Sequence, residues 1–354
     1  MTDLTAHLKQ LIALPGLSGA ETPVRTVIAE SWRPLVDELS VSRLGSLHAL
    51  RRGTGPEPRP KLLLAAHMDA IGLIVTRAEQ GLLRISGIGG VDPRILPGQL
   101  VTVHGRRDLP GVVVAPPDRL LPPDQAGKPV ELQYLLVDTG LLPDEIAQLV
   151  RIGDLVSFAQ TPLELPGDAL AGHSLDNRTS VAAVTACLTE LQHVRHAWDV
   201  WAVATVQEEV TLGGAYTSPF EIEPDLAIAI DVTFAKGPGA SDYRAFPLGS
   251  GPAFGWGANI HPALHRQFSE LADRLDIPHQ MEVMPGNSGT DAVGIQMVAA
   301  GIPTMVISIP LRYMHTPVEM IVLKDVRRTG HLLAEFIAGL EPNFIESIRW
   351  DETE

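Results

Sequence analysis

The pattern of hydrophobic and polar positions in the middle of this 354-residue chain differs from the pattern toward its two ends. Toward both ends, segments with helical spacing of apolar residues, such as 262–276 and 324–340, alternate with short continuous apolar runs at 61–66, 200–206 and 304–309. Continuous apolar runs of this length are typical of strands that are buried on both faces. Because strands that alternate with helices form mainly parallel sheets, we predict an α/β fold with helices on both sides of the sheet.

The middle of the chain has a different pattern. Short β-like pieces, such as 82–88 and 99–105, are separated by glycine and proline, and only 141–150 could form a short helix. This pattern predicts a small β-barrel-like domain inserted into a larger one. We place the inserted domain at residues 70–162 and the larger domain at residues 1–69 and 163–354.

Charge and cysteine usage narrow the class of protein. Twenty-seven Lys and Arg against 42 Asp and Glu give a net charge of −15, which disfavours nucleic acid and anionic membranes as partners. The single cysteine, Cys187, allows no intrachain disulfide and fits a reducing compartment. The start of the chain does not resemble a signal peptide, and no apolar stretch reaches membrane-spanning length, so we expect a cytoplasmic protein.

The positions just after the predicted strands carry residue types that bind metals. In open α/β sheets, ligands bind beyond the carboxyl ends of the strands. These positions, together with one predicted helix start, hold His67 and Asp69, Glu208 and Glu209, Asp231, His315, and Asp176. Taken singly, each has an ordinary explanation: Asp176 as a helix N-cap, the histidines as solvated loop residues, and the glutamates as an exposed pair.

Taken together, these residues favour a metal centre. Two histidines and several carboxylates at one sheet edge are a usual ligand mix for a pair of divalent ions. One of the adjacent glutamates could bind metal while the other stays free to transfer protons. Two ions at short separation need a bridging carboxylate, and Asp176 is the candidate because a helix start holds it in place.

Six motifs, in this order, extend the pattern: HMDAIG, SLDNR, VQEEVTLGGA, AIDVT, GTDA and SIPLRYMHTPVEM. They closely resemble those of the tetrahedral (TET) or glutamyl aminopeptidase family of dinuclear metallopeptidases, whose members are often also labelled endoglucanases. The stretches ISGIGGVDPRILPGQLVTVHGR and IGDLVSF resemble the inserted domain of that family. The resemblance covers nearly the whole chain and implies a zinc-peptidase type of α/β fold.

The resemblance also implies a role for each motif residue. One metal ion would be held by His67, Asp176 and Asp231, and the other by Asp176, Glu209 and His315. Glu208 would be the general base, and Asp69 would orient His67 by a hydrogen bond. The implied ions are zinc or cobalt, two per subunit, and the implied substrates are short peptides. The inserted domain would mediate dimerisation, and the dimers would assemble into a tetrahedral dodecamer.

Three positions depart from the family pattern. Ala70 stands where relatives typically have Glu, His173 where they often have Lys, and Asn177 where they often have Asp. None is a ligand position, so we expect metal binding to persist. His173 could be mistaken for a third metal histidine, but the family pattern has no ligand position for it.

Other activities remain alternatives at this stage. A di-metal deacylase or carboxypeptidase could use the same scaffold, and it would differ from an aminopeptidase in not needing a free α-amine on its substrate. A glycosidase would use two carboxylates without metal, which fits poorly with the accompanying histidines. A metal-binding protein without catalysis would have no need of Glu208 as a free base.

Side-chain preference is not determined by the sequence. Removal of acidic residues would call for a basic group near the site, and Lys236, Arg244 and Arg312 are the candidates close to ligand motifs. The segment 286–292 (GNSGTDA) is expected to line the substrate pocket, and its glycines would allow close approach of the backbone.

Overall fold

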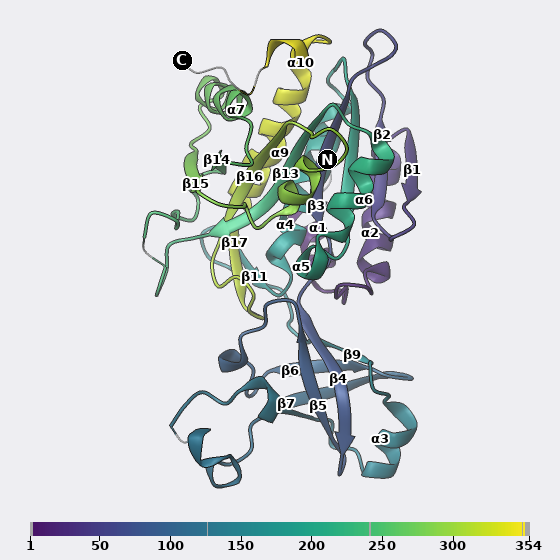
Figure 1. Cartoon of the computed structure of the whole chain (residues 1–354), viewed down its shortest axis with the longest axis vertical. Helices are drawn as coiled ribbons and strands as arrows, with labels where there is room; N and C mark the ends of the chain where they lie inside the picture. The colour runs from purple at the N-terminus through teal and green to yellow at the C-terminus, as the bar shows by residue number, and fades with distance from the viewer. Residues whose placement is uncertain (1–2, 126, 241, 349, 351–354) are drawn as a thin grey trace.

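A large α/β part and a smaller β part lie one above the other in the computed structural model (Figure 1). The structure describes residues 3–125, 127–240, 242–348 and 350. Its helices are α1 (Leu4–Ile12), α2 (Thr22–Trp32), α3 (Pro143–Leu149), α4 (Leu175–Leu191), α5 (Glu208–Thr211), α6 (Gly213–Ile222), α7 (Pro262–Arg274), α8 (Asp291–Gln296), α9 (Leu323–Ala338) and α10 (Phe344–Ser347). Its strands are β1 (Glu38–Val41), β2 (Leu47–Arg51), β3 (Lys61–His67), β4 (Gly72–Glu79), β5 (Leu82–Ile88), β6 (Leu100–His104), β7 (Asp108–Val114), β8 (Leu136–Asp138), β9 (Leu155–Phe158), β10 (Leu163–Leu165), β11 (Ala169–Gly172), β12 (Asp199–Thr205), β13 (Leu226–Phe234), β14 (Ala253–Gly257), β15 (Gln280–Met284), β16 (Thr304–Leu311) and β17 (Glu319–Val322).

The main sheet of the α/β part has eight strands in the order β1-β2-β12-β3-β13-β16-β14-β15. The central strands β12, β3, β13 and β16 run parallel to one another. On one side β2 pairs antiparallel with β12 and β1 with β2; on the other side β14 pairs antiparallel with β16, and the edge strand β15 pairs parallel with β14. A second sheet of three strands has the order β10-β11-β17. The predicted α/β fold with a mainly parallel sheet is confirmed.

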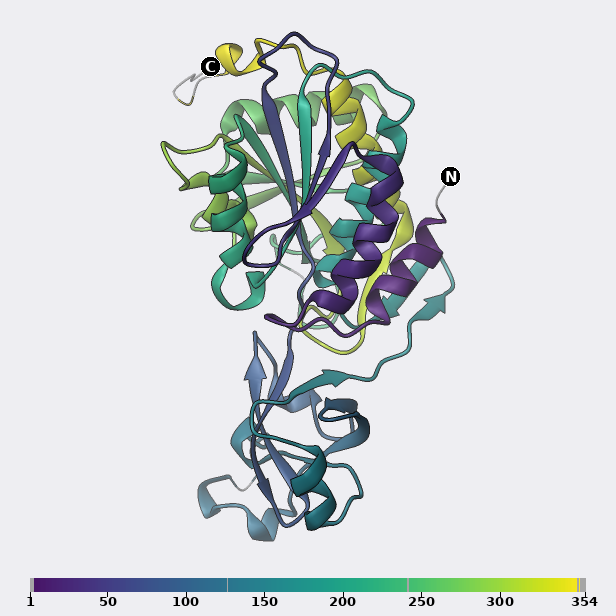
Figure 2. The same ribbon diagram turned by 90° about the vertical axis from the view of Figure 1, so that its right-hand side faces the viewer.

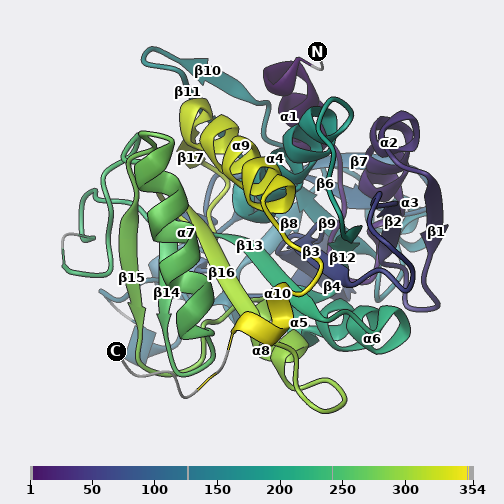
Figure 3. The same cartoon turned by 90° about the horizontal axis from the view of Figure 1, so that it is seen from above.

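Helices cover both faces of the main sheet, and this explains the continuous apolar runs. On β3, Leu62 and Leu64 join the core formed with α2, α4 and α9, whereas Leu63 and Ala65 join the opposite core with α6 and α8. Figure 3 shows α4 and α9 on one side of the sheet and α6 and α8 on the other. Because successive side chains of a strand point to opposite faces, every position of β3 after Lys61 is buried, and each leucine contributes about 1.5–3 kcal/mol.

The smaller part is a closed barrel of six strands in the order β4-β5-β8-β7-β6-β9. It has its own apolar core, which includes Leu73, Val75, Leu83, Val103 and Val137. The chain enters the barrel after β3 and returns to the α/β part after β9, as Figure 2 shows. The inserted β-barrel that the sequence predicts is therefore present.

Several elements are absent from the predictions. The strands β1, β2, β14 and β15 lie toward the edges of the main sheet. β1, β14 and β15 are partly exposed, and in the mostly buried β2 a histidine interrupts a short apolar run. Helix α6 was not predicted either, because its sequence GGAYTSPFEI contains two glycines and a proline, which are unfavourable in helices. Among the described residues, no helix is long and apolar enough to cross a membrane.

Candidate metal centre

The predicted site residues gather where the central parallel strands end, around a cavity of about 460 Å³. β3 ends at His67, and Thr205 at the end of β12 is its register partner, so the residues after both strands start side by side. Residue Asp231 lies in β13, next to β16. The side chains that line the cavity include His67, Asp176, Glu208, Glu209, Asp231 and His315.

Asp176 lies between the two histidines. Its Oδ1 is 3.2 Å from His67 Nε2, and its Oδ2 is 3.5 Å from His315 Nε2. The side chain is only 7% exposed. The ordinary explanation of Asp176 as a helix N-cap does not hold, because Ser174 holds the N-cap position of α4. Asp176 has non-helical backbone angles inside the first turn, and its carboxylate faces the cavity instead of the helix amides.

The other carboxylates complete two groups around Asp176. His67 Nε2 is 3.9 Å from Asp231 Oδ1 and 3.8 Å from Glu208 Oε2. On the other side, His315 Nε2 is 3.4 Å from Glu209 Oε2. The structure thus brings together every residue that the sequence placed at the centre, with Asp176 common to both groups.

Both histidines have the same orientation toward the cavity. His67 Nδ1 is 3.2 Å from the carbonyl oxygen of Asp69, and His315 Nδ1 is 3.1 Å from the carbonyl oxygen of Gly90 in the barrel. A carbonyl oxygen only accepts, so Nδ1 carries the proton in each ring and Nε2 is left as the electron-pair donor. This arrangement is the one that metal-ligating histidines show.

Asp69 has a second role that the sequence did not reveal. Its carboxylate lies 3.5 Å from His67 Nδ1 and also accepts hydrogen bonds from the backbone N–H groups of Glu208, at 3.0 Å, and Glu209, at 3.3 Å. Ser18 Oγ donates to the same carboxylate at 2.6 Å. Asp69 therefore holds the turn in which the chain leaves β12, and this turn lets two adjacent glutamates reach one cavity.

The electrostatics of the cavity show how crowded its carboxylates are. Burial raises the pKa of Glu208 to about 8; His67 opposes the shift, while Asp291, Glu209 and Asp176 add to it. Burial and the charge of Asp176 raise the pKa of Glu209 to about 7, against the lowering effect of both histidines. Carboxylates packed this closely repel one another unless cations lie among them.

The donor set fits divalent metal ions. His67, Asp176 and Glu209 each offer one ligand atom, and these atoms lie within 4.8 Å of one another. Imidazole nitrogen combined with carboxylate oxygen suits ions such as zinc and cobalt. Burial would lower the pKa of His67, but the surrounding carboxylates, Glu208 and Asp176 foremost, raise it well above its ordinary value. A cation is therefore favoured at this nitrogen, whether it is a proton or a metal ion.

Glu319 is a buried member of the site that sequence reasoning missed. Its carboxylate accepts hydrogen bonds from the backbone N–H groups of Asp176 and His315, each at 3.1 Å. It is 1% exposed and holds two predicted ligand residues from distant parts of the chain. Its position four residues after His315, within the motif HTPVEM, was the available signal.

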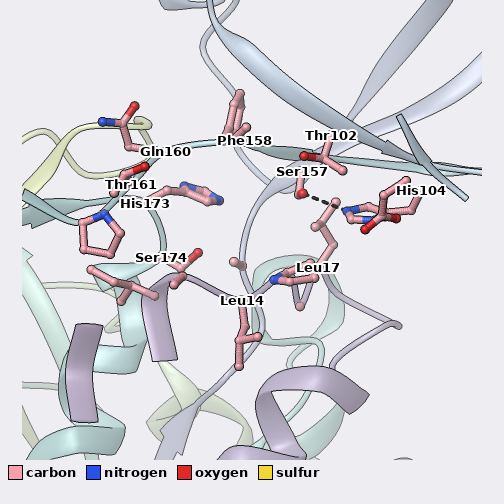
Figure 4. A pocket seen from close by; sticks show the side chains of 18 residues that line it. Leu14, Leu17, Thr102, His104, Ser157, Phe158, Gln160, Thr161, His173 and Ser174 are labelled. Carbon is pink, nitrogen blue, oxygen red and sulfur yellow. Dashed lines mark hydrogen bonds and ion pairs between the residues drawn. The ribbon is translucent and has the colours of Figure 1, made fainter. Parts of the chain in front are cut away.

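His173 lies outside the metal centre, in a second cavity of about 370 Å³ between the barrel and the α/β part (Figure 4). We call it the junction cavity; its wall includes Leu14, Leu17, His104, Ser157, Phe158, His173 and Ser174. The ring of His173 packs edge-on against Phe158, and its Nε2 is 3.2 Å from the carbonyl oxygen of Ile71. The structure thus gives His173 a place apart from the predicted ligands.

The structure also places the other residues that the sequence singled out, and only some of them line the cavity. Asn177 donates a hydrogen bond to the carbonyl oxygen of Ile230 at 2.9 Å, and Ala70 is buried. None of the three candidate cations lines the cavity: Arg244 pairs with Asp242, and Arg312 donates to the carbonyl oxygen of Lys236. Residues 287–290 do line the cavity, as expected.

Asp291, in contrast, lies behind the residues that line the metal-centre cavity. It is 2% exposed, and its carboxylate accepts a hydrogen bond from Thr205 Oγ1 at 2.5 Å. Burial raises the pKa of Asp291 to about 6, an effect that His67 opposes. Within the segment 286–292, the cavity is therefore lined by its middle residues and not by Asp291.

The comparisons with known proteins bear on this site. A family model for M42 glutamyl aminopeptidases matches residues 45–332, which is most of the chain and includes every predicted ligand. The chain belongs to the M42 glutamyl aminopeptidase family. The resemblance read from the six motifs is confirmed, and membership makes this M42 protein an aminopeptidase.

Individual relatives of this M42 protein match nearly its whole length. The lysyl aminopeptidase of Pyrococcus furiosus is 37% identical over 344 residues, which are 95% of this chain and 97% of that protein. The TET aminopeptidase of the marine sediment archaeon Thaumarchaeota archaeon SCGC AB-539-E09 has a TM-score of 0.91 at 30% identity, covering 97% of this chain and 98% of that one. The TET1 peptidase of Pyrococcus horikoshii, described as able to assemble into a tetrahedron or a large octahedral shell, has a TM-score of 0.82 at 28% identity, covering 96% and 100% of the two chains.

Proposed function

We propose that this M42 family member is a metal-dependent aminopeptidase that removes N-terminal residues from short peptides with the help of two divalent ions, zinc or cobalt. The observation that supports this proposal most directly is the placement of Asp176, whose two oxygens face two different histidines. A carboxylate in this position suits a bridge between two ions.

The ligand groups follow from the distances around Asp176. His67, Asp176 and Asp231 would hold one ion, and Asp176, Glu209 and His315 would hold the other. When bound, the two ions would polarise the scissile carbonyl and lower the pKa of a water molecule to about 7. Asp69 and Glu319 would act as positioning residues, because they hold the backbone or ring of the ligand residues.

Glu208 is the proposed general base. It lines the cavity, and unlike Glu209 it lies on the His67 side of Asp176 and away from His315. As a carboxylate in the cavity wall that neither proposed ion needs as a ligand, it could accept a proton from the attacking water and return it to the leaving amine. A free α-amino group on the substrate would complete the recognition of a peptide end.

The first test is a hydrolysis assay on aminoacyl anilides with lysyl, leucyl and glutamyl groups, each with a free and an N-acetylated amino end. The protein is assayed after metal stripping and again after zinc or cobalt is added back. We expect metal-dependent cleavage of the free-amine substrates only. Cleavage of the acetylated forms would support the deacylase alternative, and full activity of the stripped protein would contradict the metal dependence.

We also propose that the chain self-associates into dimers and then into a tetrahedral dodecamer. The support is its likeness over nearly the whole chain to the TET1 peptidase, which can assemble into such a shell, and its separate barrel, which has its own core. Light scattering at micromolar concentration measures the mass directly. A monomeric mass of about 38 kDa would contradict this proposal.

A further inference from the structure

Glu282 adds a fifth carboxylate to the wall of the metal-centre cavity. The other four belong to Asp176, Glu208, Glu209 and Asp231. Two divalent ions would balance those four negative charges, so Glu282 is the carboxylate that the proposed metal centre leaves without a counter-charge. It comes from β15, an edge strand that contributes none of the proposed ligands.

Along β15, the apolar side chains point outward and the charged one points inward, which is the reverse of an ordinary edge strand. Met281 and Val283 are 54% and 44% exposed, whereas Glu282 between them is turned inward and is only partly exposed. An edge strand normally directs apolar residues toward the protein and charges toward water. The inversion places the charge of Glu282 in the cavity wall although burial there is unfavourable.

The carboxylate of Glu282 is only half satisfied. Its Oε1 accepts a hydrogen bond from Thr233 Oγ1, whereas Oε2 is shielded from solvent and has no hydrogen-bond partner among the described residues. Burial raises the pKa of Glu282, although the hydroxyl of Thr233, which donates to it, and that of Ser308, which lies nearby without forming a regular hydrogen bond, lower it in part. A buried carboxylate with an unpaired oxygen is costly unless a cation joins it.

The rest of the cavity wall offers no such cation. Among the described residues, no lysine or arginine lines it. Its apolar side chains belong to Leu212, Val232, Phe234, Val293 and Met314. A wall of this kind can pack against the methylene groups of a long side chain whose charged end lies near a carboxylate.

We propose that Glu282 selects peptides whose N-terminal residue carries a long cationic side chain, lysine or arginine. This inference rests on the proposed aminopeptidase function and names the substrate class of the same cavity. The ammonium or guanidinium group of the substrate lies on the cavity side of Glu282 and supplies the missing counter-charge. An acidic side chain is repelled, and a neutral one leaves Glu282 without a cation.

The test compares wild-type protein with Glu282→Gln on lysyl, norleucyl and glutamyl anilides, since norleucine has the carbon chain of lysine without its charge. We expect the wild type to prefer lysyl over norleucyl, and the variant to lose about 10- to 100-fold in kcat/KM for the lysyl substrate, mainly through KM. The norleucyl value should change by less than about threefold, because uncharged substrates do not use the charge.

Glu270→Gln is the matched control. It removes the same charge from an exposed position on α7 and should leave all three values unchanged. Thermal unfolding of each variant checks that the fold is intact. An equal lysyl-to-norleucyl ratio in wild type and Glu282→Gln, or a wild-type preference for the glutamyl or norleucyl substrate, would overturn the assignment.

A binding measurement separates this inference from the proposed function. Calorimetry with lysine hydroxamate and norleucine hydroxamate on the zinc-loaded protein needs no turnover. We expect tighter binding of the lysine compound to the wild type and loss of that preference in Glu282→Gln. If no anilide is cleaved but this preference holds, the aminopeptidase proposal fails and the role of Glu282 stands; if the preference is absent, the role of Glu282 fails whatever the outcome of hydrolysis.

Discussion

The metal-centre cavity and the junction cavity both contain histidines, and their surroundings differ. At the metal centre, the Asp176 carboxylate outweighs burial and, with Glu209, raises the pKa of His315 to about 9. In the junction cavity, burial lowers the pKa of His173 to about 4, with Arg178 adding to the effect. The comparison shows that the carboxylates around a ring, more than its burial, decide whether a cation is favoured there.

The hydrogen bonds in the two cavities differ in the same way. His67 and His315 direct Nε2 at carboxylates while a carbonyl oxygen faces Nδ1. In His173, Nε2 faces a carbonyl oxygen, and Nδ1 is buried without a hydrogen-bond partner among the described residues. We therefore expect the predicted ligands and His173 to respond oppositely to mutation.

The largest effect is expected at the residue shared by both ligand groups. Asp176→Ala should lose both ions together and lower activity by more than about 1,000-fold, because neither group keeps its full set of donors. Metal content after dialysis, measured by mass spectrometry, and anilide hydrolysis are the readouts. One ion that stays tightly bound would show that Asp176 is not the bridge.

Removal of the proposed base should separate catalysis from metal binding. Glu208→Gln is expected to keep both ions and to lose about 100- to 10,000-fold in kcat, because an amide cannot accept the proton from water. Activity and metal content are measured on the same preparation. Loss of an ion in this variant would mean that the roles of Glu208 and Glu209 are exchanged.

The contact between the barrel and the metal centre provides a finer test. A Cβ at Gly90 would lie 2.6 Å from His315 Nδ1, so Gly90→Ala should displace that ring and weaken binding of the ion it holds by about tenfold. Gly87→Ala is the control, because its Cβ would meet nothing closer than 3.6 Å. Metal titration measures the affinity of both variants for the ion. Equal affinities would show that the barrel contact does not contribute to metal binding.

The smallest effect on activity is expected from His173. His173→Gln should keep both ions and change kcat/KM by less than about twofold, since the residue lies in the junction cavity. Metal content and anilide hydrolysis show this directly. Loss of an ion would place His173 among the ligands and erase the contrast between the two cavities.

The same variant should alter the dependence of stability on pH. A histidine with a folded pKa of about 4, below its ordinary 6.5, stabilises the fold above pH 6.5, and this contribution is lost as the pH falls toward 4. Wild-type protein should therefore lose about 2 kcal/mol more than His173→Gln between pH 7 and pH 5. Urea unfolding at both pH values measures the difference, and identical losses would contradict the burial of a neutral ring.

Much of the site could be predicted because parallel strands end at one edge. His67, Glu208, Glu209 and Asp231 follow or end apolar runs, and the sheet brings such ends together whatever the details of packing. Their roles in binding and catalysis are still predictions. Glu319 and Gly90 could not be predicted in this way, because each acts on a ligand from an element whose pattern says nothing about the site.

Edge elements were the other region where prediction failed. β15 was not predicted, because its sequence QMEVM is too short and too exposed to form a continuous apolar run. The inward position of Glu282 could not be predicted either, since an isolated glutamate between apolar residues is ordinarily directed at water. Only the pairing of β15 with β14 determines which face of β15 points toward the cavity.

The sequence by itself determined the α/β class, the inserted barrel, the family and the residue types at the strand ends, since periodicity and local motifs are properties of neighbouring residues. The tertiary structure decided that the two oxygens of Asp176 face two histidines, that a barrel carbonyl holds one of them, and that Glu282 faces the cavity. These are contacts through space between segments far apart in the chain, and no local pattern encodes the direction in which a side chain points across a cavity.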